Sequence, residues 1–401
     1  MTVPAEFLIF GVTLLGVAVF HRHTLSIAVF GLAVITGYKL SFGDFDGQPG
    51  LIGLQWHLLE EWVIVVNLFA LLVGFALLSR HFEKSHLPRL LPRVLPDDWK
   101  GGVVLLALVF VLSAFLDNIA AALIGATVAA AVYRNKVHIG YLAAIVAASN
   151  AGGSGSVIGD TTTTMMWLDG VSPVDVLHAY VAAAAAFIVF AIPAARQQQR
   201  FSPIEKNSPS DIEVDWSRLI VVVLILAGAV AANIYANRLP DGQGAGFPYI
   251  GATVVGIILL LTPWRRPDWS VVPAAAKGSV FLLSLVLAAS MMPVEHLPAA
   301  SPQTTLGLGF VSAVFDNIPL TKLALEQGGY DWGVLAYAVG FGGSMLWFGS
   351  SAGVAVSNLF PEARSAGQWL REGWHVAVGY VVGFLVLMAV LGWHPHATHR
   401  F

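Results

Sequence analysis

The chain has 401 residues, of which 57% are hydrophobic and only 11% are charged, and its formal net charge at pH 7 is -3. Soluble domains carry about 25% charged residues, so this composition excludes an ordinary soluble protein and predicts an integral membrane protein. The sequence contains no cysteine, which excludes disulfides, iron–sulfur clusters and thiolate metal sites.

Apolar segments that approach the ~20 residues needed to cross a bilayer as a helix recur along the chain. The first of them has no basic segment before it and no small-residue cleavage site after it, so we interpret it as a retained helix. None shows the two-residue alternation of a barrel strand. The fold class predicted is therefore an all-α polytopic membrane protein. Ten crossings are expected, at residues 6–20, 24–42, 58–79, 138–168, 173–194, 217–236, 247–263, 278–296, 331–357 and 373–393.

Two further apolar segments are predicted to be re-entrant hairpins. Residues 101–134 are too long for one helix, have basic residues on both sides, and are interrupted by an Asp-Asn pair at 117–118. A segment that enters and leaves the membrane on one side explains this arrangement. Residues 302–327 are interrupted in the same way at 316–317.

With these hairpins in place, the basic residues separate by side. Seventeen of the 21 Lys and Arg residues fall in one set of loops, three lie opposite, and Lys322 lies within the second hairpin. The positive-inside rule makes the rich side cytoplasmic, which places both termini outside and predicts a bacterial-type inner (cytoplasmic) membrane. The seventeen are Arg22, Arg80, Lys84, Arg89, Arg93, Lys100, Arg134, Lys136, Arg196, Arg200, Lys206, Arg218, Arg265, Arg266, Lys277, Arg364 and Arg371.

An internal repeat is visible in two pairs of motifs. LSAFLDNIAAAL (112–123) matches VSAVFDNIPLTK (311–322), and AGGSGSVIGDTT (151–162) matches FGGSMLWFGSSA (341–352). The predicted topology makes the two halves inverted relative to each other, as in secondary transporters, whose sites lie near the midplane. The predicted organisation is a first inverted repeat at 1–195, a cytoplasmic linker at 196–216, a second inverted repeat at 217–393 and a polar tail at 394–401.

The stretch NAGGSGSVIGDTTTTMMW (150–167) is polar where lipid is expected. Non-helical backbone at membrane depth is tolerated only within protein or beside a water-filled cavity. We therefore predict that 138–168 is a broken helix interrupted around Gly152 and Gly153, and that 331–357 is its counterpart, interrupted around Gly342 and Gly343. Such breaks expose backbone groups that bind ions.

Three carboxylates at predicted membrane depth, those of Asp117, Asp160 and Asp316, indicate a functional site. They supply the oxygen ligands that hard cations take, and they would repel an anion. We expect Na⁺ at Asp117, Asp160 and Thr161, with Asp160 as the group for which cation and proton compete. The other expected site residues are Asn118, Thr162, Asn317, Ser350 and Ser351. For Thr163 and Thr164, hydroxyl bonds to helix carbonyls are an equally good explanation.

The polar stretch, the two Asp-Asn tips and GGSMLWFGSSAGVAVSN (342–358) resemble signature segments of the NhaD-type sodium/proton antiporters. These belong to the ion transporter superfamily, which includes arsenite exporters and sodium-coupled carboxylate transporters. The resemblance implies exchange of Na⁺ or Li⁺ for H⁺ by an elevator-like or rocking motion, and it implies a homodimer. No cofactor and no nucleic-acid partner are expected.

The alternative is an anion or neutral-acid transporter, for dicarboxylate or arsenite. Lys322, which departs from the family's pattern, is the feature that favours it. Its ammonium could pair with Asp316 or extend to the outer surface. An enzyme is not expected, because the sequence has no His-Glu-x-x-His metalloprotease motif. Glu60 and Glu61, at the start of a crossing, are expected to be solvated.

Overall fold

A computed structural model describes residues 4–20, 23–45, 47–205, 213–236, 239 and 246–396. Arg22, Lys206, Arg238 and Arg400 lie outside the described residues, as do 206–212 of the predicted linker and 397–401 of the predicted tail. The predicted helical class is confirmed for the described residues. Their only strands are β1 (Asp44–Phe45) and β2 (Gln48–Pro49), which pair antiparallel ahead of a long helix.

Helices account for the remaining elements. The first half contains α1 (Ala5–Val19), α2 (Thr24–Phe42), α3 (Gly50–Lys84), η1 (Leu87–Leu90), α4 (Leu91–Val94), α5 (Trp99–Ser113), α6 (Asn118–Val132), α7 (Ile139–Ser154), α8 (Thr161–Leu168), α9 (Pro173–Leu177) and α10 (Ala179–Phe201). The second half contains α11 (Trp216–Ala236), α12 (Tyr249–Leu261), η3 (Trp269–Val271), α13 (Val272–Ser290), η4 (Val294–His296), α14 (Pro302–Ser312), α15 (Asn317–Gln327), α16 (Trp332–Gly342), η5 (Gly343–Met345), α17 (Ser351–Leu359), η6 (Pro361–Ala363), α18 (Ala366–Glu372) and α19 (Trp374–Val390).

Five described helices are long and apolar enough to cross a membrane, or six if the bent pair α18 and α19 forms one span. The five are Thr24–Phe42, Gly50–Lys84, Pro173–Phe201, Trp216–Ala236 and Trp269–Ser290. The other predicted crossings correspond to the shorter apolar helices α1 and α12 and to the two interrupted helices, α7 with α8 and α16 with α17. The chain is a multi-pass membrane protein, and ten remains the predicted number of crossings.

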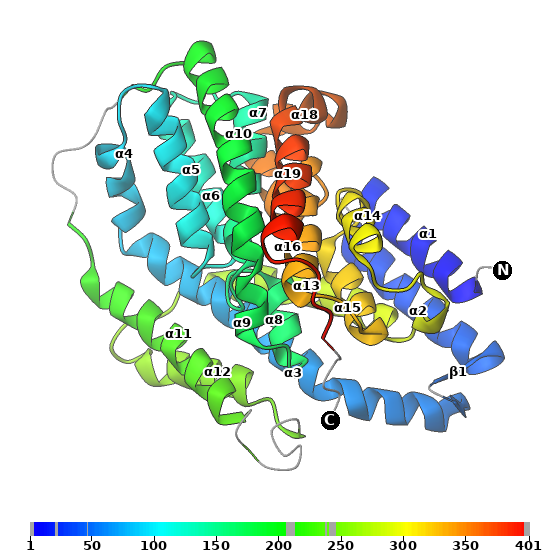
Figure 1. Ribbon diagram of the computed structural model, residues 1–401. Coiled ribbons are helices and arrows are strands. Elements are labelled where there is room, and N and C mark those ends of the chain that lie inside the picture. Colours follow the sequence, from blue (N-terminus) through cyan, green and yellow to red (C-terminus); the bar gives the residue numbers. More distant parts are fainter. Residues whose placement is uncertain are drawn as a thin grey trace.

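Helices α7 and α16 form the centre of the molecule. Nearly every residue of α7 and all of α16 are buried, and α7 packs against α5, α6, α10 and α16. Figure 1 shows α5, α7, α10 and α19 standing side by side, with α3 crossing obliquely beneath them. Helices α11 and α12 lie at one edge and α1 and α2 at the opposite edge.

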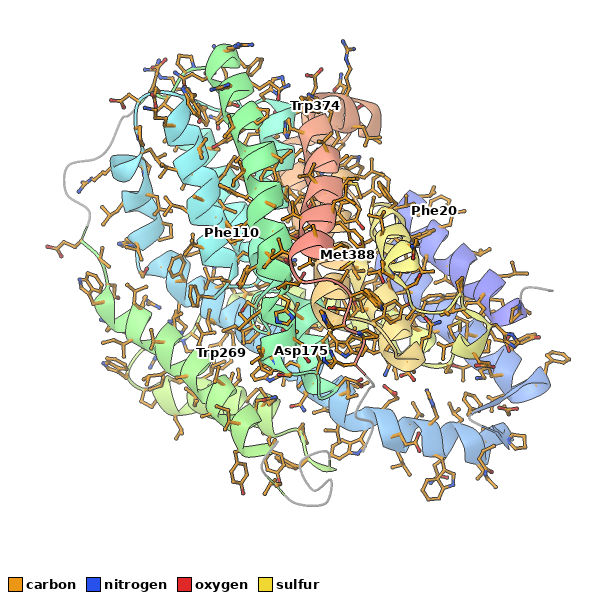
Figure 2. The ribbon with its side chains drawn as sticks, viewed as in Figure 1. Phe20, Phe110, Asp175, Trp269, Trp374 and Met388 are labelled. Carbon is orange, nitrogen blue, oxygen red and sulfur yellow. The ribbon has the colours of Figure 1, made fainter. Side chains whose placement is uncertain are left out.

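Large apolar side chains remain exposed over this assembly. Trp269 and Trp374, both labelled in Figure 2, are 47% and 52% exposed. Soluble monomers seldom expose so many large apolar groups, whereas a bilayer covers them.

The two interrupted helices pack against the preceding helix pairs in the same way. An ideal Cβ on Gly152 would lie 2.0 Å from the carbonyl oxygen of Phe110 in α5, and one on Gly342 would lie 2.2 Å from that of Gly309 in α14. Only glycine permits these approaches. Gly152 and Gly153 lie in the last turn of α7 and Gly342 and Gly343 lie at the junction of α16 with η5, so in both cases the non-helical segment follows the glycines.

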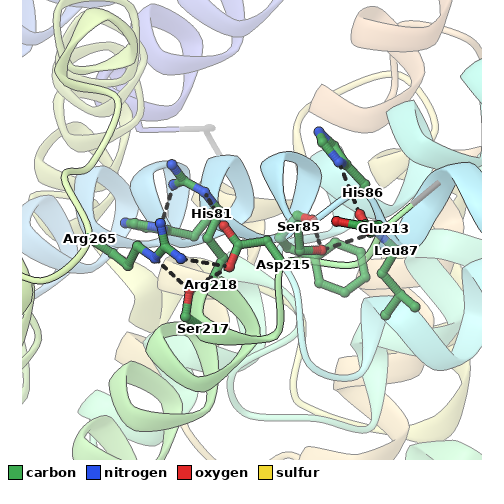
Figure 3. A network of polar contacts seen from close by, with 10 residues as sticks. His81, Ser85, His86, Leu87, Glu213, Asp215, Ser217, Arg218 and Arg265 are labelled. Carbon is green, nitrogen blue, oxygen red and sulfur yellow. Dashed lines mark hydrogen bonds and ion pairs between the residues drawn. The ribbon is translucent and has the colours of Figure 1, made fainter. Parts of the chain in front are cut away.

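A polar cluster joins the end of α3 to the start of α11 and the end of α12 (Figure 3). Arg218 lies 3.2 Å from Nδ1 of His81, and Arg265 donates to Asp215 at 3.3 Å. The backbone N–H of Asp215 donates to the carbonyl of Ser85 at 2.9 Å. Loops that the sequence assigns to the cytoplasm are therefore neighbours at one end of the molecule.

Asp268 extends this end of the molecule, because its Oδ2 lies 2.8 Å from Nζ of Lys84 and 3.4 Å from Nε of Arg80. Hydrogen bonds from Lys84 and Ser270 hold the pKa of the Asp268 carboxyl well below its ordinary value. This carboxylate lies just before the apolar span that begins at Trp269.

Candidate ion-binding site

Each Asp-Asn tip lies against the helix that follows the interruption in the other half of the chain. Asp117 and Asp316 occupy the N-cap positions of α6 and α15, at the turn of each helix pair. Helix α6 packs against α17 of the second half, and α15 packs against α8 of the first. Each half therefore contributes a tip to the interruption of the other half, and the predicted acidic residues are brought to one region.

Asp160 caps the helix that follows the first interruption. Its Oδ1 accepts a hydrogen bond from the backbone N–H of Thr162 at 3.3 Å. Its Oδ2 is buried and makes no hydrogen bond of normal geometry among the described residues, and the side chain of Thr162, whose hydroxyl also makes none, interacts with this carboxylate. The whole residue is 3% exposed and lies within electrostatic reach of Asp117 and Asp316. A buried carboxylate oxygen without a hydrogen bond of normal geometry requires a cation or a proton.

In the second half, the side-chain oxygens of Ser350 and Asp316 all have hydrogen-bond donors. Ser350 occupies the N-cap position of α17, where its hydroxyl accepts from the backbone N–H of Gly353 at 3.3 Å. Asp316 Oδ1 accepts from the N–H of Ile318 at 3.1 Å, and its Oδ2 accepts from Ser351 Oγ at 3.4 Å. This half therefore holds one carboxylate, and both of its oxygens have donors.

Asn150, which the sequence does not single out, links the two halves. Its Nδ2 donates to Ser344 Oγ at 3.0 Å and to Ser350 Oγ at 3.1 Å, and its Oδ1 accepts from Asn118 Nδ2 at 3.2 Å. The side chain is fully buried. The available signal was an amide at the end of an apolar run, directly before the first glycine-rich segment. Asn317 is also buried, at the start of α15.

The four threonines divide into two groups. Thr163 Oγ1 donates to the carbonyl of Ser156 at 2.6 Å, and Thr164 Oγ1 donates to that of Val157 at 2.9 Å. Both hydroxyls also bond the carbonyl of Asp160. Of the two explanations left open for this pair, the contacts therefore favour the structural one. Thr161 lines a cavity, and Thr162 is fully buried.

A cavity of about 430 Å³ leads to the site. Its inner part is lined by Asp117, Asp160 and Ser351. Apolar side chains of α3 and α13 form its walls, and the partly exposed side chains Arg80 and Glu83 lie at its other end. The site is thus reached from the end of the molecule that holds the polar cluster of Figure 3.

Lys322 does not pair with Asp316, and the expectation of solvation for Glu61 is wrong. The Lys322 ammonium lies 2.9 Å from both carboxylate oxygens of Glu61 in α3 and 2.7 Å from Oε1 of Glu326, one turn further along α15. Its side chain is 2% exposed, and Glu61 is buried. The physical reason is distance along the helix: Asp316 caps α15, whereas Lys322 lies more than a turn inside it and faces α3.

Within the described part of the chain, no group of three or more His, Asp or Glu side chains is arranged to hold a metal ion. The Na⁺ site expected at Asp117, Asp160 and Thr161 contains two carboxylates and a hydroxyl, and it stays a prediction. Two carboxylates, buried hydroxyls and an interrupted backbone form an oxygen-rich site of low charge, which suits a monovalent cation.

Apolar helices, two of them interrupted, that bring acidic side chains together beside a cavity are typical of membrane transporters. The family described as citrate transporter matches residues 7–342, and the chain belongs to this family. This places it in the ion transporter superfamily that includes the NhaD antiporters, as the resemblance predicted, and indicates a transporter.

Three relatives are named as antiporters. Sodium/proton antiporter 1 of Arabidopsis thaliana is 26% identical over 320 residues, which cover 71% of this chain and 54% of the relative. The chain thus spans about half the length of this plant protein. The Na(+)/H(+) antiporter NhaD of Alkalimonas amylolytica is 26% identical over 345 residues, 71% of this chain and 67% of the relative. The Na(+)/H(+) antiporter NhaD of Vibrio cholerae is 24% identical over 327 residues, which cover 70% of this chain and 68% of the relative.

Proposed function

We propose that the protein exchanges Na⁺, and also Li⁺, for H⁺ across the cytoplasmic membrane. The observation that carries the proposal is Oδ2 of Asp160, a buried carboxylate oxygen that makes no hydrogen bond of normal geometry among the described residues, at a helix interruption and beside a cavity. The names of the relatives support the same activity.

The exchange follows from competition for this oxygen. An ionised carboxylate at membrane depth is costly without a partner, and either a proton or a monovalent cation neutralises it. Only one of them can occupy Oδ2 at a time, so binding of sodium displaces the proton. Asp117 adds negative charge beside Asp160, which strengthens the attraction for both. Apparent sodium affinity should therefore improve as the proton concentration falls.

The cavity supplies access from one side. It runs from Asp117 and Asp160 to Arg80 and Glu83, at the end of the molecule that the charge distribution assigns to the cytoplasm. The conformation corresponds to an inward-facing state. An elevator-like movement of the interrupted helices and helix pairs against α3 and α13 would expose the site to the other side. Two inverted repeats, outward termini and a homodimer belong to the same proposal.

The family description favours a second candidate, transport of citrate or another carboxylate. The site opposes it, because three carboxylates would repel a polyanion. Lys322, the residue that favoured this candidate in the sequence, is neutralised by Glu61 and Glu326 and does not line the cavity. Arg80 is the cation on the cavity wall among the described residues, and it lies at the far end, beside Glu83.

The test uses everted vesicles or proteoliposomes with a pH-sensitive dye. We expect added Na⁺ or Li⁺ to collapse an imposed pH gradient, K⁺ to do so far less, and citrate to have no effect. Vesicles containing the Asp160→Asn variant at equal abundance provide the background. Proton movement that responds to citrate and not to sodium would replace the first candidate by the second.

A further inference from the structure

The repeated motif gives each residue of the first interruption a counterpart in the second. Superposing Gly152 on Gly342 pairs Asp160 with Ser350, and both of these cap the helix that follows. The same register pairs Asn150 with Gly340, one turn before the interruption in α7 and α16. The close contacts of Gly152 with α5 and of Gly342 with α14 show that this register is structural.

At these paired positions, the capping residues Asp160 and Ser350 have different neighbours from the opposite half. Asn150 reaches across to the second half, where its amide donates to the hydroxyl of Ser350 at 3.1 Å. The reciprocal position is Gly340, which has no side chain. An ideal Cβ there would lie 3.3 Å from Asp160 Oδ2 and 3.5 Å from Ser154 Cβ. The neutral hydroxyl oxygen of Ser350 therefore has a hydrogen-bond donor, whereas the charged Oδ2 of Asp160 faces a glycine.

Glycine is a poor residue for the interior of a fully buried helix, because it lowers helix stability relative to alanine. Gly340 is not at a turn, and its neighbour across the interface is a buried carboxylate oxygen that makes no hydrogen bond of normal geometry among the described residues. Any side chain at this position would contact Oδ2. The missing side chain therefore leaves that oxygen free for a ligand that the protein itself does not supply.

We propose that Gly340 determines ion specificity by leaving a coordination position at Asp160 Oδ2 open to a dehydrated monovalent cation. In the second half, the Nδ2 group of Asn150 occupies the equivalent position and presents the positive end of the amide dipole there. Only one of the two halves therefore binds an ion. This inference rests on the proposed exchange of Na⁺ for H⁺ and adds a residue and a stoichiometry to it.

The first experiment measures equilibrium binding of radioactive sodium to the purified, detergent-solubilised wild-type protein. We expect one sodium ion per chain at saturation. Two ions per chain would overturn the inference, because both halves would then bind. This result requires no variant and no transport, so it separates the inference from the proposed exchange.

The second experiment compares Gly340→Ala with Gly256→Ala, a helical glycine in α12 whose added Cβ would meet nothing within 4 Å. A methyl group against Oδ2 should raise the half-saturating Na⁺ concentration by about tenfold, which corresponds to one lost contact to a charged oxygen. The smaller Li⁺ ion should be affected less, so the ratio of the two half-saturating concentrations changes. Gly256→Ala should behave as the wild type does.

Gly340→Ser adds a hydroxyl that can replace one ligand, and its effect should lie between those of alanine and the wild type. Half-saturating concentrations and a Na⁺/Li⁺ ratio unchanged in both Gly340 variants would refute the inference while leaving the exchange intact. Absence of sodium-driven proton movement in the wild type would instead refute the proposed exchange. Sodium binding to the wild type still decides the stoichiometry if neither variant folds.

Discussion

The two halves of the site share a backbone arrangement and differ in charge. Each half of the chain supplies an Asp-Asn tip, which packs against the interrupted helix of the other half, and a residue that caps the helix after its own interruption. In the first half the capping residue is Asp160, whose Oδ2 makes no hydrogen bond of normal geometry among the described residues. In the second half it is Ser350, whose uncharged hydroxyl accepts a hydrogen bond from Asn150. The two halves thus place similar polar groups in similar backbone settings, and we propose that single side chains decide which half binds an ion.

The comparison predicts its largest difference between the two capping residues. Asp160→Asn keeps the size of the side chain but removes the charge, and it should abolish sodium-driven proton movement while the protein remains folded. Ser350→Ala should retain exchange and cost about 1 kcal/mol of stability, as expected for a lost helix cap. Dye assays and thermal unfolding of both purified variants test this. Wild-type exchange in Asp160→Asn would remove Asp160 from the mechanism.

Substitutions at the two Asp-Asn tips should differ less in their effects on exchange than substitutions at the two capping residues. Asp117→Asn removes charge next to Asp160 and should raise the half-saturating sodium concentration by about tenfold or more. Asp316→Asn should have a weaker effect, because both oxygens of Asp316 already have donors. Titration of sodium in the proteoliposome assay gives both values. A stronger effect at Asp316 would reverse the assignment of the two halves.

Lys322 offers a test of stability rather than transport. Lys322→Met leaves Glu61 and Glu326 buried without their counter-ion, and removing one partner of a buried pair typically costs about 3–5 kcal/mol. Adding Glu61→Gln should recover part of the loss. Lys277→Met, at an exposed position, is the control. Thermal unfolding in detergent measures all three, and an unchanged midpoint in Lys322→Met would contradict the buried ion pair.

The smallest effect is expected at Asp268, outside both half-sites. Its lowered pKa means that its contribution to stability is complete above the unfolded value of about 4 and is lost only as pH falls further. Ion pairs at exposed positions contribute little. Asp268→Asn should therefore shift the unfolding midpoint by no more than about 2 °C, by the same amount at pH 6 and pH 8, and leave exchange unchanged. A difference between the two pH values would contradict this.

Helix positions were largely predictable, because hydropathy reports the apolar part of each helix. The crossing predicted at 24–42 has the bounds of α2, and that at 217–236 differs from α11 by one residue. The crossing predicted at 58–79 is part of a helix that runs from Gly50 to Lys84. The helix continues through polar residues at both ends, where hydropathy gives no signal.

The partners of polar groups were less predictable. Glu61 and Lys322 are 261 positions apart, and no local pattern joins them. Adjacent residues of a helix point about 100° apart, which is why Glu60 is exposed while Glu61 is buried. The acidic residues of the site could be recognised from their cost in a membrane. The role of Asn150 could not, because it depends on how the two halves pack.

Helix α3 binds Lys322 through Glu61 in its first half, lines the cavity in its second half and binds Asp268 at its C-terminal end. Its 35 residues extend roughly 50 Å, whereas the hydrocarbon core of a bilayer is about 30 Å thick. A helix of this length must tilt or continue along the lipid headgroups, and in Figure 1 it lies obliquely to its neighbours. The thickness of the surrounding membrane therefore acts on the same element that borders the cavity, and we expect lipid chain length to affect the proposed exchange.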